Sequence, residues 1–79
     1  MKMSPITPPV YVAVAGLIRA TVWEAQAGET LQHKIVVSRL YRQNGSWHRA
    51  KTFMPRELNA VAEVITDAQE WINQRTQTA

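Results

Sequence analysis

The chain has 79 residues and a mass of 9.0 kDa, contains no cysteine, and carries nine Lys and Arg residues against six Asp and Glu residues. This length excludes two-domain architectures, and the lack of cysteine excludes a disulfide framework, a thiolate nucleophile and cysteine-ligated metal sites. A chain this short buries only about 60 to 65% of its extended-chain surface on folding, so we expect a small single domain that pairs into a homodimer.

Membrane insertion and secretion are both disfavoured by the N-terminal third of the chain. The longest apolar run, residues 10–18, is less than half as long as a membrane-spanning helix. Lys2 followed by an apolar stretch is superficially similar to a signal peptide, but Pro8 and Pro9 precede the run, and cleavage there would remove part of the core. We therefore expect a cytoplasmic protein without a membrane partner.

The first half of the chain predicts a flexible arm and two strands. Residues 1–9 contain three prolines and no periodicity, which indicates a flexible N-terminal arm before a single domain over residues 10–75. The β-branched and aromatic residues of 10–14 predict a strand, and Gly16 ends it at a bend or bulge. Residues 17–25 alternate as a second, half-buried strand. Its apolar face holds Ile18, Ala20 and Val22, and its other face holds Arg19, Thr21 and Trp23.

The middle of the chain predicts a turn and a β-hairpin. Residues 27–29 contain a turn glycine and separate the second strand from a third over residues 31–43. Asn44 and Gly45 form a strong hairpin signal, after which residues 46–54 return as a fourth strand.

From Pro55 onward the apolar period changes from that of a strand to that of a helix. The predicted apolar face consists of Leu58, Val61, Ile65, Ala68 and Ile72, with Val64 and Trp71 on its flank. Pro55 suits the first helical position, whereas Met54 is a poor cap, and residues 76–79 are predicted to fray. The predicted fold is thus α+β: a four-stranded antiparallel β-meander followed by one C-terminal amphipathic α-helix. One helix covers one face of a sheet, so the other face must meet water, a second subunit or a ligand.

Charge is segregated along the chain. Residues 30–56 contain six basic and no acidic residues, whereas residues 57–74 contain four acidic and no basic residues. The net charge of +3 therefore combines a strongly basic sheet region with an acidic helix. One-signed surfaces often steer a charged partner, although solvated charge alone is the simpler explanation.

Aromatic residues lie among these basic residues. Cations that follow phosphates and flat rings that stack on unpaired bases are the two requirements of single-stranded nucleic-acid binding. The candidate binding residues are Arg19, Trp23, Arg39, Tyr41, Trp47, Arg49 and Lys51. The same rings are also suited to a core or to a dimer interface.

The hairpin register decides which of these residues share a face. A three-residue loop at Asn44 and Gly45 places Arg39 and Tyr41 with Trp47, whereas a two-residue loop places Leu40 and Arg42 there instead. Both registers are possible from the sequence. In either register we expect Trp47, Arg49 and Lys51 to share a face.

No pattern of catalytic residues is present. His33 and His48 are the only histidines, and no third residue completes a metal site at a usual spacing. Glu24 and Glu29 lack the further carboxylates that a magnesium-dependent nuclease needs. No phosphate-binding loop or nucleophile elbow occurs, so we expect no enzyme activity, no cofactor, no metal and no small-molecule substrate.

The order of these features resembles the transcriptional coactivator family called positive cofactor four. The resemblance lies in residues 12–24, which read VAVAGLIRATVWE, in the central basic stretch, and in residues 54–58, MPREL. The chain is also similar to a group of small uncharacterised bacterial proteins that share the RATVWE strand and an Arg-x-Tyr followed by Gly-x-Trp. The resemblance covers about residues 10–73. This chain differs from the coactivator family in its shorter, less lysine-rich N-terminal arm and in a sheet richer in tryptophan.

The coactivator family and the related whirly proteins bind single-stranded DNA on β-sheet surfaces of dimers or larger assemblies, without catalysis. The resemblance therefore implies a non-enzymatic module that binds single-stranded DNA or RNA through the candidate residues, in transcription, replication or DNA transfer. The alternative is a protein-interaction module whose exposed sheet face forms a homodimer or binds an acidic partner.

Overall fold

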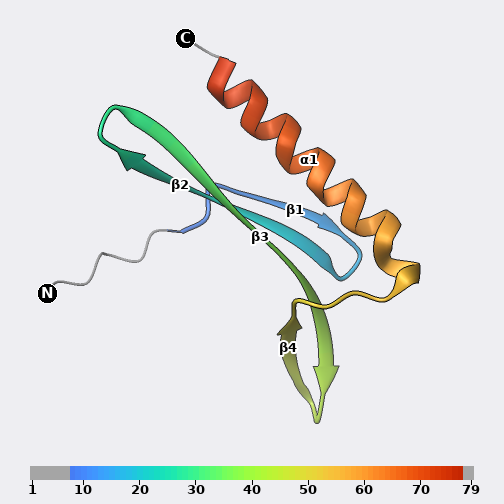
Figure 1. Ribbon diagram of the computed structural model, residues 1–79. Coiled ribbons are helices and arrows are strands. Elements are labelled where there is room, and N and C mark those ends of the chain that lie inside the picture. The colour runs from blue at the N-terminus through green and yellow to red at the C-terminus, as the bar shows by residue number, and fades with distance from the viewer. Residues whose placement is uncertain (1–7, 78–79) are drawn as a thin grey trace, which may run out of the picture.

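The computed structural model describes residues 8–77 and has four strands followed by one long helix (Figure 1). The elements are β1 Tyr11–Ala15, β2 Ile18–Ala27, β3 Thr30–Gln43, β4 Ser46–Ala50, the short 3₁₀ helix η1 Pro55–Glu57, and α1 Leu58–Gln77. This confirms the predicted α+β meander with a C-terminal helix. Residues 1–7 of the predicted arm and residues 78–79 of the predicted tail lie outside the described residues. No helix in the described part of the chain is long and apolar enough to cross a membrane.

The four strands form one antiparallel sheet in the order β1-β2-β3-β4, and two-residue turns join them. The last turn contains Asn44 and Gly45, with φ of 53° and 78°. Positive φ at both central residues is the mark of a type I′ turn, whose twist matches that of the flanking strands. The pairs Gln43–Ser46 and Arg42–Trp47 therefore close the hairpin, and the three-residue alternative does not occur.

The fourth strand is shorter than the sequence predicts. We expected it to continue to residue 54, but it ends at Ala50, which pairs with Arg39. Arg39 also donates a hydrogen bond from Nε to the carbonyl of Thr52 at 3.1 Å, so the chain has already left the ladder there. The connection must cross to the helix side of the sheet before Pro55, which cannot donate a ladder hydrogen bond.

The buried core lies between α1 and the first two strands. Its six fully buried apolar residues are Ala13, Ile18, Ala20, Val22, Val64 and Ala68. Three of these are alanines, which allow the helix to lie close to the sheet. Figure 1 shows α1 running alongside β1 and β2, whereas β4 and the end of β3 project past the start of the helix.

The buried face of α1 differs from the predicted one. Val64, expected on the flank, is 1% exposed and lies at the centre of the contact, whereas Leu58 and Ile65 are 58% and 45% exposed. Trp71, also expected on the flank, packs on the core and stacks on Tyr11 at 5.2 Å between ring centroids. The prediction for this helix face is confirmed for Val61, Ala68 and Ile72, which are buried or pack against the core. It is wrong for Leu58 and Ile65, because α1 is rotated so that its Val64 side meets the alanines of the sheet.

Side-chain hydrogen bonds hold both ends of the helix. At its start, Glu57 accepts a hydrogen bond from the Met54 backbone N–H at 2.6 Å, so Glu57 supplies the cap that Met54 cannot. Arg39 lies 3.4 Å from the same carboxylate and links β3 to the helix start. At the other end Arg75 donates two hydrogen bonds to Glu24 of β2.

The contacts on the helix side shift the pKa values of Glu24 and Tyr11. The hydrogen bonds from Arg75 lower the pKa of Glu24 to about 2, partial burial opposes this, and His33 at 3.0 Å adds to it. Tyr11 donates a hydrogen bond to Asp67 at 2.7 Å, which raises the pKa of the phenol. These contacts connect α1 to β1 and β2 and contribute to stability.

Candidate nucleic-acid interface

The sheet face turned away from α1 is referred to here as the open face. Residues directly opposite each other in an antiparallel sheet share a face, so the pairing assigns every strand residue. The open-face pairs that carry charged or aromatic side chains are Val14–Arg19, Arg19–Ser38, Trp23–Lys34, Leu40–Arg49 and Arg42–Trp47. The helix-side face holds the core residues of β1 and β2 together with Glu24 and His33.

All charged strand residues of the open face are basic. They are Arg19, Lys34, Arg42 and Arg49, and among the described residues no strand contributes a carboxylate to this face. Glu24, the one carboxylate in the strands of the described residues, points to the helix side, where it bonds to Arg75. The open face is therefore electropositive, because the carboxylate that would neutralise part of it is held by the helix.

The most exposed aromatic ring of this face lies in the β3–β4 hairpin. Trp47 is 55% exposed, and the guanidinium carbon of Arg42 lies 5.6 Å from the centre of a Trp47 ring. The flat ring and the cation are presented to solvent together, beside the exposed side chain of Arg49. A nucleotide needs both kinds of contact, a surface for its base and a cation for its phosphate.

A second aromatic group lies further along the sheet. Trp23 on β2 is half-buried and stands opposite the exposed Lys34 on β3. Arg42 follows Lys34 by eight positions along β3, which corresponds to up to about 27 Å of strand. The two aromatic-basic pairs therefore lie toward opposite ends of the open face.

Arg19 lies between these pairs and is half-buried. It stands opposite Ser38, which is buried. The Nε atom of Arg19 is buried and has no hydrogen-bond partner among residues 8–77.

The seven residues predicted to bind nucleic acid do not share one face. Arg19, Trp23, Trp47 and Arg49 lie on the open face, as the sequence pattern predicts for them. Arg39 and Tyr41 lie on the opposite face because the hairpin loop has two residues. Lys51 follows the end of β4, so no strand pairing assigns it to a face.

Arg39 and Tyr41 have other contacts on the helix side. Arg39 contacts Glu57 and Thr52, as described above, and its guanidinium lies 5.6 Å from the Tyr41 ring centre. Tyr41 stacks on His48 at 5.3 Å. Arg39 thus stabilises the connection to the helix, and Tyr41 belongs to the reverse side of the hairpin.

Two residues of the open face, Lys34 and Arg42, are absent from the predicted set. The signal for both was available in the two-residue turns. Counting back along both strands from the two-residue turn at Gly28 and Glu29 places Trp23 opposite Lys34. Counting back from the type I′ turn at Asn44 and Gly45 places Arg42 opposite Trp47 in the same way.

Clusters of titratable side chains are few in the part of the chain that the structure describes. Within residues 8–77 no three His, Asp or Glu side chains gather as they would around a metal ion. One grouping of titratable residues, Glu24 with His33 and Arg75, is held together by its own hydrogen bonds.

Comparison with known proteins gave no match, either to a protein family, to a curated protein or to a solved structure.

Proposed function

We propose that this protein is a non-enzymatic module that binds single-stranded DNA or RNA on the open face of its sheet. The observation that carries the proposal is the composition of that face: four basic residues, two tryptophans and no strand carboxylate within the described residues. Base stacking contributes about 1–3 kcal/mol per base, and phosphate neutralisation supplies affinity without sequence preference. We place this activity in the cytoplasm.

The residues have distinct roles in this proposal. Trp47 and Trp23 stack on unpaired bases, and Lys34, Arg42 and Arg49 neutralise phosphates between and around them. Duplex DNA offers phosphates but hides its bases, so the rings favour single strands over duplex. The separation of the two tryptophans predicts that one strand must span much of the sheet to reach both.

Fluorescence anisotropy of a labelled oligothymidine tests the proposal. The full chain should bind at micromolar or lower concentration, quench tryptophan fluorescence, and resist competition by duplex of equal length. The logarithm of affinity should fall linearly with that of salt concentration, with a slope of about −2.1 if Lys34, Arg42 and Arg49 each neutralise one phosphate. A strand of about 20 nucleotides should bind more tightly than one of about 5, because only the longer strand reaches both tryptophans. Absence of binding at low salt, or equal binding of duplex, would contradict the proposal.

A second candidate function is the docking of an acidic protein partner on the same face. The observation that favours it is the apolar edge beside the basic residues, where Val12, Val14 and Leu17 are exposed. Such a partner would use these side chains, which a nucleic acid would not need. Retained single-strand binding in a Val14→Ser variant would favour nucleic acid as the ligand.

A further inference from the structure

A stripe of uncharged side chains runs along one flank of α1. It consists of Leu58, Ala62, Ile65, Gln69 and Ile72. The spacings of four, three, four and three residues are those of a helix that packs against another helix. The acidic residues Glu63 and Glu70 lie on the other flank, in the region that also contains Asp67.

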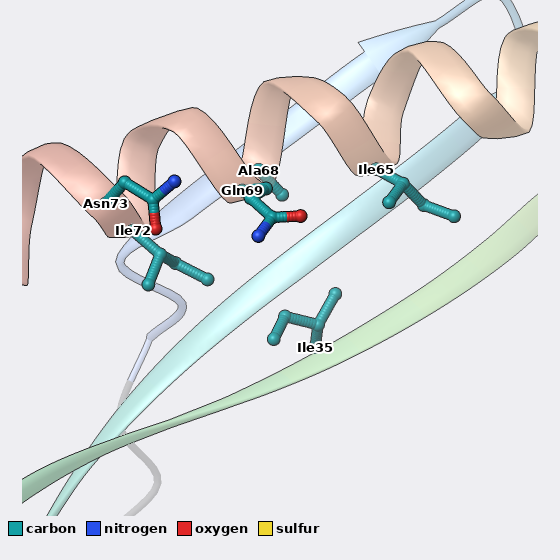
Figure 2. Close-up of a pocket in the computed structure, with 6 residues that line it drawn as sticks. All are labelled: Ile35, Ile65, Ala68, Gln69, Ile72 and Asn73. Atoms are coloured by element: carbon teal, nitrogen blue, oxygen red, sulfur yellow. The ribbon is translucent and has the colours of Figure 1, made fainter.

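Three residues of this stripe, Ile65, Gln69 and Ile72, line an apolar groove between α1 and β3. The groove has a volume of about 290 Å³ and is lined by Ile35, Ile65, Ala68, Gln69, Ile72 and Asn73. Figure 2 shows Ile35 pointing from the strand toward the helix, with Ile65 and Ile72 pointing toward it from α1. Ile35 is 42% exposed because α1 lies over β1 and β2 and leaves this part of β3 uncovered.

The single chain exposes more surface than a compact monomer of its mass. Its accessible surface is 6175 Å², whereas about 4900 Å² is expected for 9.0 kDa. The radius of gyration is 14.7 Å, compared with about 12 Å for a compact domain of this length. The projecting β3–β4 hairpin contributes to this surface, and so do the apolar side chains beside the groove: Leu58, Ile65 and Ile35 are 58%, 45% and 42% exposed.

The stripe is self-complementary under two-fold symmetry. If two copies of α1 pack antiparallel with Ile65 at the symmetry axis, Leu58 of each copy faces Ile72 of the other. The small Ala62 then lies within one residue of the level of the longer Gln69 in the other copy. A surface that matches itself in this way is what a two-fold dimer interface requires.

We propose that a second copy of this chain occupies the groove, with the two α1 helices antiparallel and Ile65 at the two-fold axis. Charge favours this arrangement, because the uncharged stripes meet and the acidic flanks point away from each other. The interface lies on the helix side, so both open faces stay accessible. The proposal is independent of nucleic-acid binding and differs from a dimer formed through the open face.

Sedimentation of the full chain tests the proposal without any nucleic acid. The wild-type chain should sediment at twice its mass of 9.0 kDa at high micromolar concentration. Ile65→Glu should yield the monomer, with the dissociation constant of the dimer raised about 100-fold or more, since two carboxylates then meet at the axis. Val14→Glu, which changes a residue 51% exposed on the open face, should leave the dimer intact. A monomeric wild type, a dimer that survives Ile65→Glu, or a dimer that Val14→Glu dissociates would overturn the proposal.

Cross-linking provides a readout that does not depend on a disruptive substitution. Because the chain lacks cysteine, an introduced cysteine is the only thiol. An Ile65→Cys variant should be linked to its own copy by a short bismaleimide, since packed helices lie about 8–10 Å apart. A Glu63→Cys variant, on the acidic flank, should remain unlinked. Equal linking of both variants, or none of Ile65→Cys, would contradict the antiparallel pairing.

Discussion

Replacement of Trp47 by alanine separates a binding role from a structural one. Trp47 is 55% exposed, and the Arg42 guanidinium lies 5.6 Å from the centre of its ring. The Trp47→Ala variant should therefore lose this exposed cation–π contact, about 0.5–1 kcal/mol of stability. A stacked base contributes about 1–3 kcal/mol, so the Kd for oligothymidine should rise about 5- to 150-fold. Anisotropy titration measures the affinity, and circular dichroism of the same samples checks that the variant is folded.

The matched control is Tyr41→Ala, on the reverse side of the same hairpin. Tyr41 is one residue away from Arg42 in sequence, but it points to the helix side and stacks on His48. Its removal should change the Kd by less than about twofold, because it lies off the open face. If Tyr41→Ala weakens binding as much as Trp47→Ala does, or if Trp47→Ala binds like the wild type, the assignment of binding to the open face is wrong.

Three further predictions concern the core, the salt dependence and the pH dependence. Val64→Ala should lower the free energy of unfolding by about 2–3 kcal/mol and the Tm by roughly 10–20 °C. The exposed-site control Val14→Ala should lower the free energy of unfolding by less than about 0.5 kcal/mol. If thermal melts show similar losses of stability for the two variants, the helix orientation is wrong. Arg49→Ala should reduce the magnitude of the salt slope for single strands by about 0.7, and an unchanged slope would mean that Arg49 contacts no phosphate. The pKa of Glu24 is lowered from 4.5 to about 2 in the folded chain, so its contribution to stability is present above pH 4.5 and is lost as the pH falls toward 2. Acid unfolding of Glu24→Gln should therefore show a weaker pH dependence in that window, and an identical dependence would show that this ion pair does not contribute.

Local sequence patterns determined the order and nature of the secondary-structure elements. Ile18, Ala20 and Val22 alternate with the residues of the other face because side chains of a strand point to opposite faces in turn. This pattern can be read within one segment, without knowledge of its partners. Asn44 and Gly45 act within four residues, since their tolerance of positive φ selects the turn. The change of period at Pro55 marked the helix for the same local reason.

The candidate site was only partly predictable because face membership depends on pairing between segments. A shift of one residue in a hairpin moves every side chain to the other face, so the register alone excluded Tyr41 from the open face and added Arg42. The role of Arg39 depends on Glu57, a residue 18 positions later that approaches it only when the helix returns across the sheet.

The same limit explains the helix. Its sequence determined that the α1 segment is amphipathic, but Val64 and Ile65 are both apolar and adjacent, so the pattern leaves two neighbouring faces equally suited to the core. The tertiary structure decided between them, since alanines on β1 and β2 admit the Val64 side closely and leave Ile65 beside the uncovered Ile35. Amphipathicity is a property of one helix, whereas the direction in which it is buried depends on the shape of the surface that receives it.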